Sequence, residues 1–112
     1  MMTLENNSQK IAELNDTFRK TFIGGQVLAT AGVQALPPEQ QQAVFQAVQA
    51  FNTFTEDNDP YGEHDFGAFS LYGQRFNWKI DCYDPSMQWG SEDPTDPQQT
   101  KRVLTILLAE EY

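Results

Sequence analysis

Residues 55–97 contain most of the side chains in this 112-residue chain that could do chemistry. Ten of the sixteen acidic residues, both tryptophans, the single histidine and the single cysteine lie there, beside only one arginine and one lysine. Carboxylates interleaved with aromatic rings can bind a basic protein surface, a metal ion or a small ligand. These residue types point to a binding site in this segment, but they do not specify a reaction.

The run DNDPYGEHD, residues 57–65, imitates the start of a calcium-binding loop, with acids at positions one and three and glycine at position six. Tyr61 occupies position five, and Ala68 occupies position twelve, where an EF-hand requires a bidentate glutamate. An EF-hand is therefore excluded. The alternative is a turn whose Asp and Asn side chains accept bonds from nearby N–H groups. The candidates for looser Ca²⁺ or Mg²⁺ coordination are Asp57, Asp59 and Glu63.

His64 is the candidate for acid–base chemistry, because a histidine held by a carboxylate can act as a general base. Its sequence neighbours Glu63 and Asp65 complete the candidate catalytic set, and Asp59 would extend it to a metal-assisted enzyme. On a strand, however, both neighbours would point away from the histidine. The other interpretation is a structural histidine that is hydrogen-bonded within its loop. We favour a protein that is not an enzyme and needs no cofactor.

Cys82 is the only cysteine, which excludes an intrachain disulfide and a cysteine-based zinc site. Alternation places it on the same strand face as Trp78 and Ile80, so we expect a buried side chain. A nucleophile is disfavoured, because no cationic group that would lower the thiol pKa is evident nearby.

Negative charge dominates the chain, with a formal net charge of −9. Such a charge repels phosphate backbones, so direct nucleic-acid binding is not expected. It can instead attract a partner protein with a basic surface, including a surface that normally holds nucleic acid. The predicted partner-binding residues are Asp57, Asp59, Glu63, Asp65, Glu92, Asp93 and Asp96 for charge, with Tyr61 and Trp89 as aromatic anchors.

The N-terminal sequence MMTLENNSQK lacks the cationic and apolar blocks of a signal peptide. No apolar run approaches the ~20 residues that cross a bilayer. We therefore expect a cytoplasmic protein that does not contact a membrane, and a single cysteine suits a reducing compartment.

The first half of the chain predicts two helices and a strand. Apolar residues three and four apart indicate a helix from about Ser8 to Phe22 that ends before Gly24-Gly25, with residues 1–7 frayed. Residues 26–33 read as a strand. A second helix begins at Pro37-Pro38, and its apolar stripe is Val44, Phe45, Val48, Phe51 and Phe54.

The second half predicts strands. Residues 66–71 and 76–83 alternate around the turn Tyr72-Gly73-Gln74, which indicates a β-hairpin. Residues 84–98 form a long, acidic, proline-rich loop. Residues 103–109 read as a buried central strand, with a short helix as the alternative. The order predicts one α+β domain over residues 1–112, with two amphipathic helices on one face of a mostly antiparallel four-stranded sheet.

Five segments carry a resemblance to a known family: IAELNDTFRKTFIGGQV, GVQALP, FNTFTEDNDPYGEHDFGAF, WKIDCYDP and RVLTILLAEEY. They resemble DUF3768, a bacterial family of unknown function, from Ile11 to Tyr112. The resemblance implies a small cytosolic domain of a kind common in proteobacteria and often encoded on mobile elements. Its pattern usually has tyrosine where this chain has Cys82, which argues further against thiol chemistry. It implies no catalytic or binding residue.

We therefore expect a small acidic protein-binding module, for instance an anti-CRISPR or anti-restriction inhibitor that docks on a basic, nucleic-acid-binding surface. One alternative is the metal-assisted or acid–base enzyme of the Asp59, Glu63, His64 and Asp65 cluster. The other is a structural or regulatory homodimer, joined through the hairpin edge or the final strand.

Overall fold

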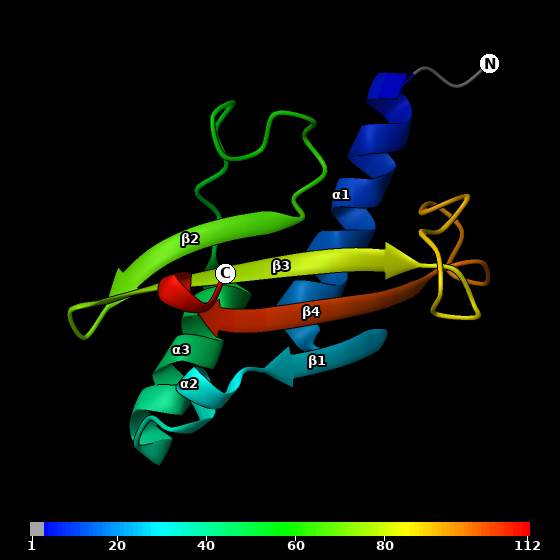
Figure 1. Ribbon diagram of the computed structural model, residues 1–112. Helices are drawn as coiled ribbons and strands as arrows, with labels where there is room; N and C mark the ends of the chain where they lie inside the picture. Colours follow the sequence, from blue (N-terminus) through cyan, green and yellow to red (C-terminus); the bar gives the residue numbers. More distant parts are fainter. Residues whose placement is uncertain (1–3) are drawn as a thin grey trace.

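A four-stranded sheet carries helices on one of its faces in the computed structural model, which describes residues 4–112 (Figure 1). The strand order is β1-β4-β3-β2, with β1 parallel to β4 and the other neighbours antiparallel. The predicted α+β fold, with its mostly antiparallel four-stranded sheet, is confirmed. The elements in chain order are α1 (Leu4–Thr21), β1 (Gly25–Ala29), α2 (Ala31–Gln34), α3 (Pro38–Ala50), β2 (Phe66–Leu71), β3 (Gln74–Tyr83), β4 (Lys101–Leu108) and the 3₁₀ helix η1 (Ala109–Glu111).

The final strand lies inside the sheet, as its continuous apolar composition predicts. β4 pairs with β1 on one side and with β3 on the other, which leaves β1 and β2 as the edge strands. The prediction that a homodimer could form through the final strand is therefore wrong, because both sides of β4 already have strand partners. The hairpin edge β2 remains open to such pairing.

Three boundaries in the first half of the chain differ from the predictions. α1 begins at Leu4 and not near Ser8, so the helix includes residues 4–7 of the segment predicted to be frayed, while residues 1–3 lie outside the described part. The strand predicted over 26–33 ends at Ala29, and residues 31–34 form a helical turn whose Gln34 N–H donates to Thr30 O at 2.9 Å. α3 ends at Ala50, so Phe51 and Phe54 reach the core from an extended segment.

The core lies between the helices and one face of β3 and β4. Trp78 is at its centre, fully buried against Phe51 and Phe54 with ring centroids 5.5 and 6.2 Å away. Alternation along the two central strands brings every second side chain to this face. The buried core residues are Phe18, Val33, Val44, Val48, Phe76, Trp78, Ile80, Leu104 and Ile106.

The Glu111 carboxylate fixes the end of the described chain against the start of α2. It accepts hydrogen bonds from the Thr30 hydroxyl at 2.6 Å, the Gly32 N–H at 3.0 Å and the Leu108 N–H at 2.8 Å. The first of these bonds is also the main reason that the pKa of Glu111 is lowered. These bonds connect the end of β4 to the residues that follow β1, at the end of the sheet that also carries the hairpin turn. Within residues 4–112, no helix has the length and apolar character needed to cross a bilayer.

Gly67 on β2 permits the close approach of the hairpin to the core. A Cβ atom at this position would overlap the Trp78 indole nitrogen and would lie 2.8 Å from a ring carbon of Phe51. Both rings are held by further packing, so the contact cannot be relieved cheaply.

We predict that Gly67→Ala lowers the free energy of unfolding by about 1–3 kcal/mol, because it overpacks the core beside Trp78. Urea denaturation followed by tryptophan fluorescence measures the change. Ser70→Ala on the same strand, at an exposed position, is the control and should change stability by less than about 0.5 kcal/mol. Equal stability of Gly67→Ala and the wild type would contradict this account of the core.

Candidate functional site

Arg19 of α1 anchors the segment 51–65, which connects α3 to β2. Its side chain is 1% exposed. Its Nε donates to Val48 O at 3.1 Å and its Nη2 donates to Phe51 O at 2.8 Å. The guanidinium carbon also lies 5.0 Å from the Trp78 ring centroid. The charge is therefore buried with carbonyl oxygens and an aromatic face around it, the conditions under which a buried cation is tolerated.

The third partner of Arg19 connects it to His64. Arg19 Nη1 donates to Asp16 Oδ1 at 2.8 Å, and Asp16 Oδ2 lies 2.9 Å from His64 Nδ1. The imidazole stacks on Phe54, with ring centroids 3.8 Å apart and an interplanar angle of 3°. A chain of contacts thus runs from the buried guanidinium through one carboxylate to a half-buried imidazole.

The backbone of His64 has a left-handed conformation, with φ of 54°. A residue other than glycine adopts this conformation only when the surroundings impose it. Here the His64 N–H donates to Asp59 Oδ1 at 3.1 Å, while the imidazole is fixed by Asp16 and Phe54. His64 Nε2 lies 3.6 Å from Asp59 Oδ2, which is too long for a hydrogen bond.

The partners of His64 differ from those that the sequence suggests. Its ring contacts Asp16 and Asp59, and not its neighbours Glu63 and Asp65. Asp16 is 48 residues away in the sequence, so local spacing cannot reveal it. The sequence does contain a pattern that could have identified Arg19. It lies four residues after Asn15, so the two polar residues fall on the same side of α1, and that side is buried.

Asn15 of α1 connects two acidic loops, which are the segment 51–65 and the loop 84–100. Its Nδ2 donates to Glu63 O at 2.9 Å, and its Oδ1 accepts from Arg102 Nε at 2.8 Å. The same arginine donates through Nη2 to Pro94 O in the loop 84–100, which connects β3 to β4. In Figure 1 the segment 51–65 and the loop 84–100 lie on either side of α1. Asn15 therefore fixes the backbone of the segment 51–65 directly, and it is connected to the loop 84–100 through Arg102 of β4.

Carboxylates crowd together where the segment 51–65 enters β2. Burial raises the pKa of Glu63, and repulsion from Asp65 and Asp59 raises it further. Burial also raises the pKa of Asp65, with smaller contributions from Asp59 and Asp81. We call these four residues the acidic cluster. Its members raise one another's free energy when all of them are ionised.

The Cys82 thiol borders this cluster and is not activated by it. Burial is the largest effect on its pKa and raises it, and the nearby carboxylates raise it further. The expectation that no cation lies nearby is wrong, since Arg102 is its cross-strand partner. Arg102 acts to lower the pKa, but burial outweighs it. Cys82 lies on the same face as Trp78 and Ile80, as predicted, but its side chain is partly buried and not buried as expected.

An open groove of about 640 Å³ runs between α1 and the turn that precedes His64. Tyr61 lies at its wall and is 79% exposed, while Asp16 and His64 form part of its lining. Asp16 contacts Nδ1 of His64, and Asp59 is the carboxylate nearest to Nε2. The complete lining is Ser8, Gln9, Ala12, Glu13, Asp16, Pro60, Tyr61, Gly62 and His64.

The predicted partner-binding residues divide into two groups. Tyr61, Trp89, Asp57 and Glu92 are exposed, and Glu63 and Asp65 are half-buried in the acidic cluster.

The other members hold their own loops together. Asp59 is buried and accepts the His64 N–H. Asp93 accepts from the Thr95 N–H at 3.1 Å, and Asp96 accepts from the Gln98 N–H at 2.9 Å. These are the turn interactions expected of Asp side chains.

The candidate metal ligands do not converge. Within residues 4–112, no group of three or more His, Cys, Asp or Glu side chains is arranged to hold a metal ion. Asp59 lies inward while Asp57 lies on the surface, although only one residue separates them.

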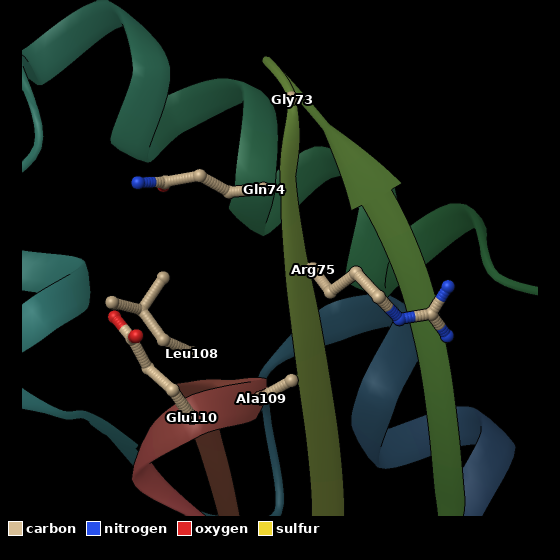
Figure 2. A pocket seen from close by; sticks show the side chains of 6 residues that line it. All are labelled: Gly73, Gln74, Arg75, Leu108, Ala109 and Glu110. Carbon is tan, nitrogen blue, oxygen red and sulfur yellow. The ribbon is translucent and has the colours of Figure 1, made fainter.

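A second hollow lies at the turn of the hairpin, away from the groove, and fewer side chains that could do chemistry line it. It is lined by Gly73, Gln74, Arg75, Leu108, Ala109 and Glu110. In Figure 2 the Gln74 and Glu110 side chains reach toward the same space, while the Arg75 guanidinium points away from it. The hollow contains no aromatic ring.

We predict that Arg19→Met lowers the free energy of unfolding by about 3 kcal/mol or more, because Asp16 and two buried carbonyl oxygens lose their donor. Urea denaturation measures the loss. The adjacent Lys20→Met removes the same charge from an exposed position and should cost less than about 0.5 kcal/mol. If the two variants were equally stable, Arg19 would not anchor this segment.

We predict that Glu63→Gln stabilises the protein at neutral pH. A carboxyl group whose pKa is raised by folding binds more protons in the folded state, so the stability of the wild type falls as pH rises above the ordinary value of 4.5. The variant removes this cost, and its advantage should vanish below that pH. Thermal melting across a pH series measures the difference.

Asp84→Asn is the control of opposite sign. A hydrogen bond from the Ser86 hydroxyl is the main reason that the pKa of Asp84 is lowered. Asp84 therefore contributes stability above the ordinary value of 3.8, and this contribution is lost as pH falls through the lowered value. Asp84→Asn should be less stable than the wild type at neutral pH. A destabilised Glu63→Gln at neutral pH would contradict the crowding of carboxylates.

Comparison with known proteins gives a family and no characterised relative. A family model described as "Protein of unknown function (DUF3768)" matches residues 29–111. Neither a search of curated proteins nor a search of solved structures found a match. The family match spans the segment 51–65, the loop 84–100 and all of β2, β3 and β4, whereas α1 and all of β1 except Ala29 lie outside it. The chain therefore belongs to the DUF3768 family of proteins of unknown function.

Proposed function

We propose that this protein is a binding module that docks through its acidic loops on a basic surface of a partner protein. The observation that carries the proposal is the acidic cluster, in which Glu63 and Asp65 are half-buried beside the exposed ring of Tyr61; burial raises the pKa of both carboxyl groups, and neighbouring carboxylates raise it further. A cationic surface placed against the cluster would remove this repulsion. The relief of repulsion is a favourable free energy that appears only in the complex.

The attachment of both acidic loops to α1 supports the proposal. The bonds of Asn15 and Arg102 fix Glu63 in one loop and Pro94 in the other. Loops that are ordered before binding lose less conformational entropy when a partner docks. The carboxylates of Asp59, Asp93 and Asp96 contribute to this order, whereas Asp57 and Glu92 present charge to solvent.

The net charge of −9 defines the chemistry of the partner. It favours fast association with a positively charged protein and opposes contact with phosphate groups. A channel or groove that normally holds nucleic acid is the kind of surface that fits. An inhibitor of a host-defence nuclease, of the anti-CRISPR or anti-restriction type, is the form of this function that we propose.

Charge reversal in the loops tests the proposal. Immobilised Asp57→Lys/Glu92→Lys protein should lose the partner that the wild type captures from a nuclease-treated host lysate at low salt. The wild-type complex should also dissociate at about 0.5 M salt and on addition of an oligonucleotide, because exposed charges are screened and the nucleic acid competes.

The matched control is Glu39→Lys/Glu110→Lys, which changes the net charge by the same amount at exposed positions outside the two loops. This variant should retain capture. Equal capture by both variants, or a captured protein that ignores salt and oligonucleotide, would overturn the proposed function.

A further inference from the structure

We propose that the groove between α1 and the turn at residues 60–64 receives an arginine side chain of the partner, with Tyr61 and Glu13 contacting its guanidinium group. This inference rests on the proposed function and names the contact at which specificity would arise. The groove is open, and both of the proposed contact residues are exposed along it. It thus offers space, an aromatic ring and a carboxylate together.

The charges around the groove suit a cation. Glu13 and Asp16 line it, and Asp59 lies directly behind His64. Arg19 and a protonated His64 together would still leave these three carboxylates with an excess of negative charge. An incoming cation therefore meets an attractive potential whichever form the imidazole takes.

The chain already contains the arrangement that we propose, one layer deeper. The Arg19 guanidinium lies against an Asp16 oxygen at 2.8 Å and over the Phe54 ring at 5.4 Å from the centroid. A carboxylate edge combined with an aromatic face is a geometry that a planar guanidinium satisfies better than a lysine ammonium does. Glu13 and Tyr61 supply the same two kinds of group along the groove, and Asp16 is part of the same lining.

The floor of the groove is rigid. His64 is held by its stack on Phe54, by Asp16 at Nδ1 and by the bond of its N–H to Asp59. A fixed floor keeps Tyr61 close to α1, since only Gly62 and Glu63 separate Tyr61 from His64. Binding at a preformed groove costs less ordering of the receptor than binding at a flexible loop.

The test is an NMR titration of the full chain with a short peptide that carries one arginine among glycines. A peptide with citrulline in place of arginine is the control, because citrulline keeps the shape and removes the charge. We expect saturable shifts confined to the amides of residues 8–16 and 60–64, and binding of the citrulline peptide that is weaker by about fivefold or more.

Glu13→Gln/Tyr61→Ala should reduce arginine-peptide affinity by about fivefold or more, since it removes both contacts. Glu110→Gln/Tyr112→Ala makes the same two changes at exposed residues near the C-terminal end and should bind like the wild type. Shifts that are absent, spread over the whole acidic surface or unchanged in Glu13→Gln/Tyr61→Ala would overturn the inference.

Partner capture separates this inference from the function on which it rests. Capture that is lost in Asp57→Lys/Glu92→Lys but retained in Glu13→Gln/Tyr61→Ala would leave the proposed function standing and would remove the arginine groove. Capture that survives in both variants would remove both.

Discussion

The guanidinium group of Arg19 contacts α3, the core of the sheet and the start of the segment 51–65. It bonds to the last turn of α3, to the first residue after that helix and to Asp16 on its own helix, and it covers the Trp78 ring. A buried charge stabilises a fold only when all its donors find acceptors. The position of the segment that follows α3 is thereby coupled to the packing of the core. The imidazole of His64, one carboxylate away, inherits this fixed position.

The acidic cluster has the opposite effect on stability from the bonds of Arg19. Folding brings Glu63 and Asp65 into partial burial beside Asp59 and Asp81, which costs free energy at neutral pH. The bond of Asn15 to Glu63 O fixes the backbone of the same segment, and Arg102 in turn bonds to Asn15. These bonds offset part of that free-energy cost. Unfavourable local electrostatics that the rest of the fold sustains is a common property of binding and catalytic sites. This combination is the physical reason for which we propose a binding role for this end of the molecule.

Amino-acid patterns predicted the elements well and the site only in part. Alternation around Tyr72 and Gly73 identified the hairpin, and the continuous apolar run identified β4 as a central strand. The strand predicted over 26–33 failed at Thr30, because Val33 reaches the core from a helical turn and not from an extended chain. Local spacing singled out His64, but its partner Asp16 comes from a helix 48 residues away. Contacts of that kind depend on tertiary packing, which a local pattern does not encode.

The central claim is that Arg19, Asp16 and His64 hold the segment 51–65 in a fixed conformation before any partner binds. Amide hydrogen exchange of the free protein tests it most directly, at the His64 N–H. This amide donates to the buried carboxylate of Asp59 in a segment without strand or helix structure. The account predicts that it exchanges slowly, with protection close to that of core amides on β3 and β4. Exchange at the rate of an exposed loop amide would contradict the account, because the groove and the acidic cluster would then have no preformed shape.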